Sequence, residues 1–180
     1  MPVPSVRRLT LVAATIATGL AAGFFYAYHV SVVRGHARIG DRAYVEAMQA
    51  INATVRNWEF FLGFFGALIL GAAALALRAG RWRSPTTRLL AVGVALYLAA
   101  FLVTMLVNVP LNEELATVAL SSPDLAAVRA DYEPPWNRAN ALRTGLSIAA
   151  FACLVAAVAS DRRPNHSRAG AVGAAVTGRT

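Results

Sequence analysis

The stretch that decides the fold is residues 89–109, LLAVGVALYLAAFLVTMLVNV, which contains no charged residue. A helix needs roughly 20 apolar residues to cross a hydrocarbon core of about 30 Å, so this stretch predicts a transmembrane helix. Three further stretches have similar length and composition, although the last of them carries Arg143. We expect four transmembrane helices, at Leu9–Val33, Phe60–Leu77, Leu89–Val109 and Ala139–Ser160.

The composition agrees with a membrane protein. Of the 180 residues, 57% are hydrophobic and 14% charged, and the mean hydropathy is +0.52. These values exclude an ordinary soluble domain. We predict an all-α fold, an integral membrane antiparallel four-helix bundle, as one domain over residues 1–160. Residues 161–180 are rich in Arg, Gly and Ala and predict a disordered cytoplasmic tail.

Arginine sets the predicted orientation in the inner cell membrane. The net charge is +8 and the chain contains no lysine. The arginines cluster at both flanks of the bundle and between the second and third spans, at Arg7, Arg8, Arg78, Arg81, Arg83, Arg88, Arg162, Arg163 and Arg168. The positive-inside rule then places both termini in the cytoplasm. Because topology explains the basic charge, we predict no nucleic-acid partner. The first apolar run is too long for a signal peptide and predicts a membrane anchor.

An additional amphipathic helix is predicted over residues 40–55. Tyr44, Met48, Ile51 and Val55 fall on one stripe of that helix, opposite a polar stripe. Asp41 suits the positive end of the helix dipole. We expect this helix to lie on the outer face, at the interface or as a cap on the bundle.

The segment after the third span contains helix-breaking residues. Pro110 removes a backbone donor, so the third helix should end or kink there. Residues 111–135 are polar and end in Glu-Pro-Pro, which predicts a long loop with a short helix starting near Ser122.

Polar side chains from several segments fall near the outer ends of the predicted helices. They are His29, Asn108, Asn112, Asn140 and Arg143, with Glu46, Gln49 and Asn52 on the outer helix above them. Ionisable and amide groups at membrane depth are costly and usually face a protein interior or a wet cavity. We predict an outward-opening pocket under the outer helix. The alternative is a set of unrelated interfacial residues, because helix ends are wet.

Single residues in this set also have purely structural explanations. His29 is the only one whose ordinary pKa lies near neutrality, yet a histidine at a helix end is often interfacial. Arg143 can pair with Glu46, Glu59 or Glu133 to fix the fold. Tyr26, Tyr28 and Trp136 fit the headgroup level, where one end of the side chain is wet.

Metal and nucleotide motifs are missing from the sequence. No span holds two histidines, and the chain has a single cysteine and no His-x-x-Glu pattern. We find no phosphate-binding glycine loop, nucleophile elbow or dinucleotide fingerprint. The sequence therefore predicts no metal site.

Four blocks of residues occur in an order and at separations that resemble a known family. The blocks are GFFYAY (23–28), YVEAMQAIN (44–52), NVPLN (108–112) and WNRANALRT (136–144). The chain resembles the anthrone-oxygenase-like family of small four-span membrane proteins, over roughly residues 19–158. The resemblance implies oxidation of an anthrone, a tricyclic aromatic ketone, to an anthraquinone by O₂. It also implies that no metal, flavin or other cofactor is needed.

The resemblance implies three kinds of role in such a reaction. The acidic methylene of the substrate needs a base, and the oxyanion that develops needs a cation. We assign His29 or Glu46 as the base and Arg143 as the cation. The remaining candidates would bind a lipophilic substrate through hydrogen bonds or ring stacking, namely Tyr26, Gln49, Asn108, Asn112, Trp136 and Asn140.

Two other classes of function fit the same features. A non-enzymatic membrane protein that binds a small molecule or assembles a larger complex would also carry a polar pocket. A transport subunit is the second alternative. Glycines are dense in the spans and let helices approach closely, within one chain or between copies in a homo-oligomer.

Overall fold

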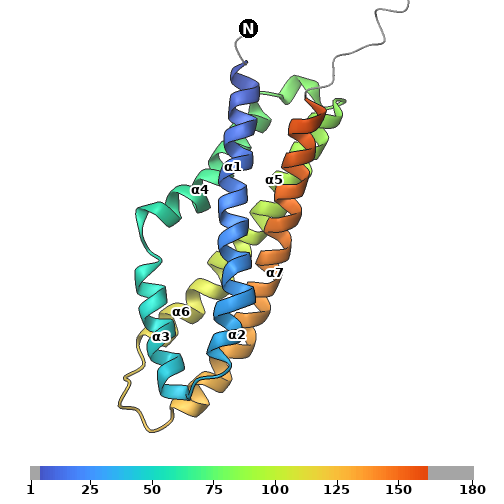
Figure 1. The fold of residues 1–180 in the computed structure, drawn as a ribbon. Coiled ribbons are helices and arrows are strands. Elements are labelled where there is room, and N and C mark those ends of the chain that lie inside the picture. The colour runs from blue at the N-terminus through green and yellow to red at the C-terminus, as the bar shows by residue number, and fades with distance from the viewer. Residues whose placement is uncertain (1–4, 162–180) are drawn as a thin grey trace, which may run out of the picture.

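The computed structural model describes residues 5–161 and contains only helices over that range (Figure 1). The all-α bundle predicted from the sequence is confirmed. The elements in chain order are α1 (Val6–Ala27), the π-helical turn η1 (Tyr28–Val32), α2 (Val33–His36), α3 (Asp41–Thr54), α4 (Trp58–Ala76), the 3₁₀ turn η2 (Ala79–Arg81), α5 (Pro85–Val103), the π-helical turn η3 (Thr104–Asn108), α6 (Val109–Ala116) and α7 (Leu125–Ser160).

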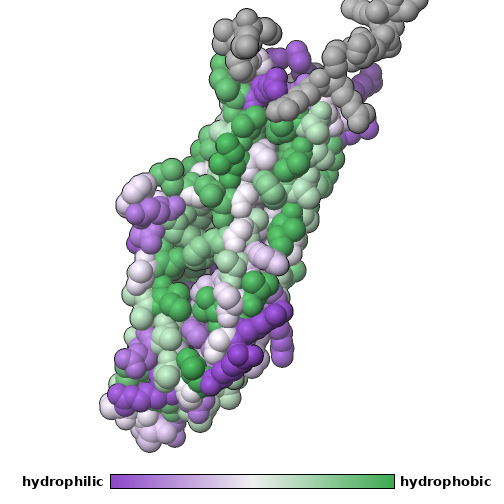
Figure 2. Space-filling view, viewed as in Figure 1, coloured by the Kyte–Doolittle hydropathy of each residue, from purple (hydrophilic) through white to green (hydrophobic). Residues whose placement is uncertain are grey.

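Four of the continuous helical segments are long and apolar enough to cross a membrane, as the hydropathy predicted. They are Val6–His36, Trp58–Ala76, Pro85–Ala116 and Leu125–Ser160. Figure 2 shows a hydrophobic band on their surface between hydrophilic ends. Neighbouring spans run antiparallel: α1 packs against α4 and α7, and α5 packs along α7 (Figure 1). The chain is therefore a membrane protein with a four-helix core.

A glycine permits the close approach of α5 and α7. A Cβ built on Gly93 would overlap Leu154 Cδ1 and would lie 3.2 Å from the Ala150 carbonyl oxygen and 3.3 Å from Cys153 Cβ. Leu154 is itself fully buried in the core beside Leu90. Because Gly93 has no side-chain carbon, the backbones of α5 and α7 can pack directly against each other. Close packing of this kind is how helices associate in lipid.

The amphipathic helix predicted over residues 40–55 is confirmed as α3, and it caps one end of the bundle. Its buried residues Tyr44, Val45 and Met48 pack on α7 and α6. The cap end has its own hydrophobic core, which also includes Leu115 and Tyr132. We call the opposite end, where residues 5 and 161 lie (Figure 1), the terminal end.

The long polar loop predicted over residues 111–135 is wrong. Helix α6 continues to Ala116 and α7 already begins at Leu125, so the connection covers only residues 117–124. Both helical extensions bury apolar side chains in the cap, Leu115 and Leu125 among them. Tertiary packing of this kind outweighs local sequence preference.

Three prolines of this region lie inside helices, whereas Pro123 lies in the connection between α6 and α7. Pro110 lies in the first turn of α6, directly after the π-helical turn η3. Proline has no backbone N–H to donate, and the π-helical turn accommodates this loss, so the helix continues. Pro134 and Pro135 lie within α7. Ala130 and Asp131, whose carbonyls lose their helical partners, are exposed, so those carbonyls remain accessible for hydration.

Arg78 fastens the terminal end of the bundle. Its guanidinium is buried and donates to the Arg7 carbonyl oxygen at 2.7 Å and to Asp161 Oδ2 at 3.3 Å. The start of α1, the end of α4 and the end of α7 are thereby joined. Asp161 is the only residue of the predicted disordered tail that the structure describes, and residues 162–180 lie outside the described range.

We expect Gly93→Ala to lower the free energy of unfolding by about 1–3 kcal/mol, because the new methyl group overpacks the α5–α7 contact. Gly66→Ala is the matched control, since nothing lies within 4 Å of the Cβ built there; it should be neutral or slightly stabilising. Thermal unfolding in detergent compares the two variants. Equal melting temperatures would refute the packing role of Gly93.

Candidate functional site

A cavity of about 260 Å³ lies beneath the cap, between the first, second, third and fourth spans. Aromatic rings make much of its wall, and α4 supplies half of them. Polar groups reach it from α3, α6 and α7. The residues used below that line it are Phe24, Phe25, Tyr28, Asn52, Phe60, Phe64, Asn112, Trp136 and Arg143.

Arg143 is the only charged side chain that is buried in this cavity. It is 7% exposed, and its Nε and Nη2 atoms donate to Asn140 Oδ1 at 3.2 and 2.9 Å. The guanidinium carbon lies 4.5 Å from the ring centroid of Phe25 and 5.3 Å from that of Trp136. Two aromatic faces therefore flank the cation, an arrangement that stabilises a desolvated guanidinium.

No carboxylate balances Arg143 within residues 5–161. None of the ion pairs found there includes it. The structural explanation predicted for Arg143, a pair with Glu46, Glu59 or Glu133, is therefore wrong. Glu133 pairs instead with Arg129, at 2.7 Å. A buried cation without a carboxylate partner is energetically expensive.

Two asparagines on the third span hold Trp136, one through its indole N–H and the other through its backbone carbonyl oxygen. Asn112 Oδ1 accepts from Trp136 Nε1 and from the Tyr132 hydroxyl, both at 2.7 Å. Asn108 Nδ2 donates to the Trp136 carbonyl oxygen at 3.3 Å. Asn108 closes the π-helical turn η3 and is fully buried. These contacts hold the indole ring against the cavity beside Arg143.

Two amide atoms near Arg143 lack a partner among the described residues. They are Asn108 Oδ1 and Asn140 Nδ2, and both side chains are fully buried. Buried polar atoms in native structures nearly always have a hydrogen-bond partner. Neither residue lines the cavity, so these two atoms represent one acceptor and one donor without a partner directly behind its wall.

A comparison with protein families finds one match, to the anthrone oxygenase family model, over residues 58–153. The chain belongs to the anthrone oxygenase family. Comparisons with curated proteins and with solved structures give no match. The family match supports an oxygenase-like role at the family level.

Five of the nine predicted site residues converge in this anthrone oxygenase family protein, and all five lie within the matched segment. They are Asn108, Asn112, Trp136, Asn140 and Arg143. Asn112, Trp136 and Arg143 line the cavity directly. Asn108 and Asn140 stand behind them and contact Trp136 and Arg143.

The structure does not bring the other four predicted residues to the cavity. Tyr26 and Glu46 are exposed, and His29 is half-buried on η1; none of the three lines the cavity. Gln49 Nε2 donates to the carbonyl oxygens of Leu115 and Val118, at 2.8 and 2.9 Å. Gln49 thus joins α3 to the end of α6.

Sequence reasoning missed Tyr28 as a cavity residue. It was expected at the headgroup level, but it is buried and its ring lies 5.4 Å from that of Trp136. Its hydroxyl donates to Met48 Sδ at 3.2 Å. Phe60 and Phe64 were also missed; they follow each other on α4 with stacked rings 5.2 Å apart. Their spacing of four residues was the available signal.

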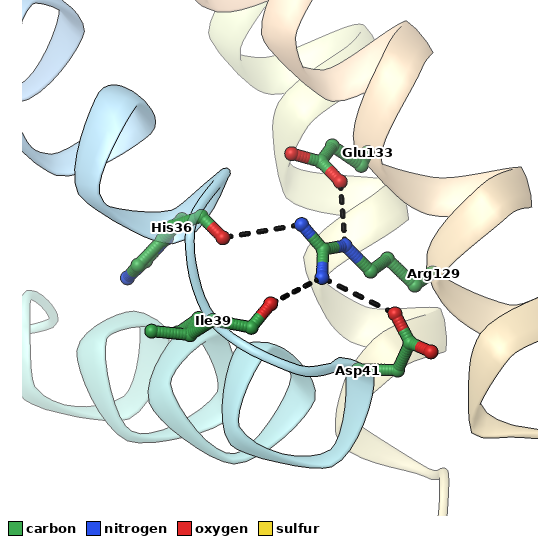
Figure 3. A network of polar contacts seen from close by, with 5 residues as sticks. All are labelled: His36, Ile39, Asp41, Arg129 and Glu133. Carbon is green, nitrogen blue, oxygen red and sulfur yellow. Dashed lines mark hydrogen bonds and ion pairs between the residues drawn. The ribbon is translucent and has the colours of Figure 1, made fainter.

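Arg129 holds the cap in place over the cavity (Figure 3). Its guanidinium donates to Glu133 Oε2 (2.7 Å), Asp41 Oδ1 (3.2 Å) and the carbonyl oxygens of His36 (3.1 Å) and Ile39 (2.7 Å). One side chain of α7 thereby fixes the segment between α2 and α3. Arginine suits this task because its planar fork presents five donors.

Arg129 also lies over the ring of Tyr44, 4.4 Å from its centroid. Burial, reinforced by the nearby Glu133 carboxylate, raises the pKa of the Tyr44 phenol above its ordinary value. Tyr44 therefore stays neutral and acts as an apolar surface under the guanidinium.

We expect Arg129→Ala to lower the free energy of unfolding by about 2 kcal/mol, because its charge-assisted hydrogen bonds lose their donor. Amide exchange should rise first at residues 36–41, and hydrogen exchange with mass spectrometry locates that change. Arg38→Ala is the control, since Arg38 lies exposed in the same segment. Unchanged exchange in Arg129→Ala would contradict the role of this network.

Proposed function

We propose that this chain is a membrane-embedded oxygenase that oxidises an anthrone-like or other lipophilic aromatic substrate with O₂, without a cofactor. The observation that carries the proposal is the buried, uncompensated guanidinium of Arg143 between two aromatic rings. Such a cation favours an aromatic ligand that becomes anionic during the reaction. The family match supports the oxygenase class.

The lining of the cavity suits an aromatic ring system. Among the rings that line it, those of Phe60 and Phe64 are nearly parallel, at an interplanar angle of 16°. Phe25 and Trp136 supply further faces next to Arg143. The volume of about 260 Å³ lies near the lower bound of ordinary ligand pockets, roughly 300–1,000 Å³. A compact planar substrate fits this space better than a flexible chain.

Arg143 would stabilise the ionised substrate. Loss of a proton from the methylene between the two aryl rings delocalises a negative charge onto the ketone oxygen. A guanidinium beside that oxygen favours the ionised form, and it does so strongly where water is excluded. Asn140 Oδ1 orients the guanidinium, while Asn112 and Trp136 position the ring.

The reaction balances without an external reductant. The anion transfers one electron to O₂, and the resulting radical and superoxide combine to form a C–O bond. Protonation gives a hydroperoxide. Loss of the remaining hydrogen on that carbon, with cleavage of the O–O bond, then yields the new carbonyl and one water. A methylene and O₂ are thus converted to a ketone and water, as a monooxygenase stoichiometry requires.

The proton acceptor is the part of the proposal that differs from the sequence prediction. His29 and Glu46, the predicted bases, do not line the cavity. We assign Arg143 to the stabilisation of the anion, and we assign Glu59, which lines the adjoining groove, as the acceptor of the proton. Glu59 is exposed and can pass the proton to solvent.

The proposed location remains the inner membrane with both termini in the cytoplasm. The structure supports it in one respect, because residues 5 and 161 lie at the same end of the bundle (Figure 1). The arginine-rich connection between α4 and α5 lies at that end as well. The cap and the cavity would then face the outer side.

We expect Arg143→Gln to lower O₂ consumption with a model anthrone at least 100-fold, as happens when an oxyanion donor is removed. Arg143→Lys keeps the charge without the planar fork and should be intermediate. Arg138→Gln, an exposed arginine on the same helix, is the matched control and should keep the wild-type rate. An oxygen electrode in detergent measures each rate above the uncatalysed oxidation.

Full activity of folded Arg143→Gln would refute this assignment of the site. Binding of a hydroxyanthraquinone, followed by the absorbance of its phenolate, separates binding from turnover. A wild type that binds this probe through Arg143 but consumes no O₂ with any anthrone would support a small-molecule-binding protein instead.

A further inference from the structure

A second hollow adjoins the cavity and opens on the side of the bundle. It is a groove of about 680 Å³ between α1 and α4, roofed by α3. The face drawn in Figure 2 is hollowed between α1 and the α3–α4 connection. Six residues line both the groove and the cavity, so the two spaces share one wall: Phe24, Tyr28, Ile51, Val55, Phe60 and Phe64.

The groove reaches the depth of the hydrocarbon. Trp58, 69% exposed at the start of α4, marks the interface. Gly63 lies five residues further along α4, about 7.5 Å deeper at 1.5 Å per residue. On the facing helix, Leu20 is 66% exposed and Phe24 is 42% exposed. Lipid-facing side chains thus form the rim of the groove on the side away from the cap.

The polarity of the groove changes along its length. Asn57 and Glu59 line its end near the interface, while Leu20, Ala21 and Gly63 line the deeper part. An apolar ring system with a phenolic edge matches this arrangement, because it also has one polar edge and an apolar body. A Cβ built on Gly63 would lie 3.9 Å from Leu20 Cβ, an ordinary van der Waals contact, so a methyl group there would bridge α4 and α1 in the deep part of the groove.

Packed aromatic side chains form most of the wall between the groove and the cavity. The centroids of Phe24 and Phe60 lie 5.2 Å apart at an angle of 56°. Side chains of this kind change rotamer on the nanosecond scale when they are partly exposed. Asn57 Oδ1 accepts from the Phe60 backbone N–H at 2.8 Å and fixes the backbone from which that ring moves.

We propose that the substrate is taken up laterally from the bilayer through this groove and passes between Phe24 and Phe60 into the cavity. This inference rests on the proposed function, since it assumes that the cavity holds the substrate. It makes Leu20 an access residue, which controls how fast the substrate arrives but not how tightly it binds, whereas Phe24 and Phe60 form the passage and also line the cavity.

A reversible block tests the route without affecting folding. Leu20→Cys in a Cys153→Ala background is purified, reconstituted in vesicles and labelled with a bulky benzyl thiosulfonate. Ile16→Cys in the same background is the matched control, because Ile16 is equally lipid-exposed on α1 but does not line the groove. Stopped-flow absorbance then gives the association and dissociation rates of a hydroxyanthraquinone.

We expect the label at residue 20 to slow association and dissociation by the same factor, about tenfold or more, and to leave Kd unchanged. Reduction of the label should restore both rates, and the label at residue 16 should change neither. The association rate should also follow the mole fraction of probe in the membrane when the amount of lipid is varied.

Three outcomes would overturn the inference. Unchanged rates with the label at residue 20 exclude the groove as the route, while Arg143-dependent binding still supports the proposed function. A raised Kd makes the groove part of the binding site. Absence of any binding that depends on Arg143 would refute the proposed function and this inference together.

Discussion

The structure is organised around one buried charge, the guanidinium of Arg143. Within the described residues it has no carboxylate partner, and its only side-chain hydrogen bonds are to Asn140. Removing a charge from water costs several kcal/mol unless other groups compensate. Here the faces of Phe25 and Trp136 provide part of the compensation. The hydrogen bonds that fix Trp136 therefore also stabilise the cation, which ties the asparagines of the third span to the site on the fourth.

Two irregular turns contribute residues to the surroundings of this charge. The π-helical turns η1 and η3 interrupt the first and third spans, and each begins or ends at a residue near the site, Tyr28 and Asn108 respectively. A π-helical turn widens the helix by one residue and redirects the side chains that follow it. The additional residue is costly in a regular helix, so such turns persist mostly where function requires them. Tyr28 and Asn108 both contact Trp136, which lies beside Arg143, and this agrees with the proposed active site.

Much of the fold followed from hydropathy, because a hydrocarbon core of fixed thickness leaves few alternatives to spans of about 20 residues. The cap did not follow in the same way. Residues 111–135 appear polar in isolation, and only the burial of Leu115, Leu125 and Tyr132 against α3 shows why they are helical. Local patterns contain no information on such long-range packing.

Residue spacing predicted the contacts between site residues that share one helical face. It did not predict which face of the first span lies toward the cavity. Asn140 and Arg143 are three residues apart on one helix, so their contact followed from spacing. Tyr26 and His29 belong to the same short segment as Phe25 and Tyr28 but point elsewhere. The packing of the first span against α4 and α7 decides which of its sides faces the cavity. A single sequence does not reveal that packing.

Exclusion of water links the buried cation to the apolar walls around it. Two unit charges 4 Å apart attract by about 1 kcal/mol in water and by about 4 kcal/mol at an effective dielectric constant near 20. The difference of about 3 kcal/mol corresponds to roughly a hundredfold more of the ionised substrate, at about 1.4 kcal/mol per factor of ten. A wide aqueous opening beside Arg143 would remove that gain. Closure by the Phe rings and by α3 is therefore a chemical requirement, and an apolar path from the bilayer admits the substrate while the cation stays dry.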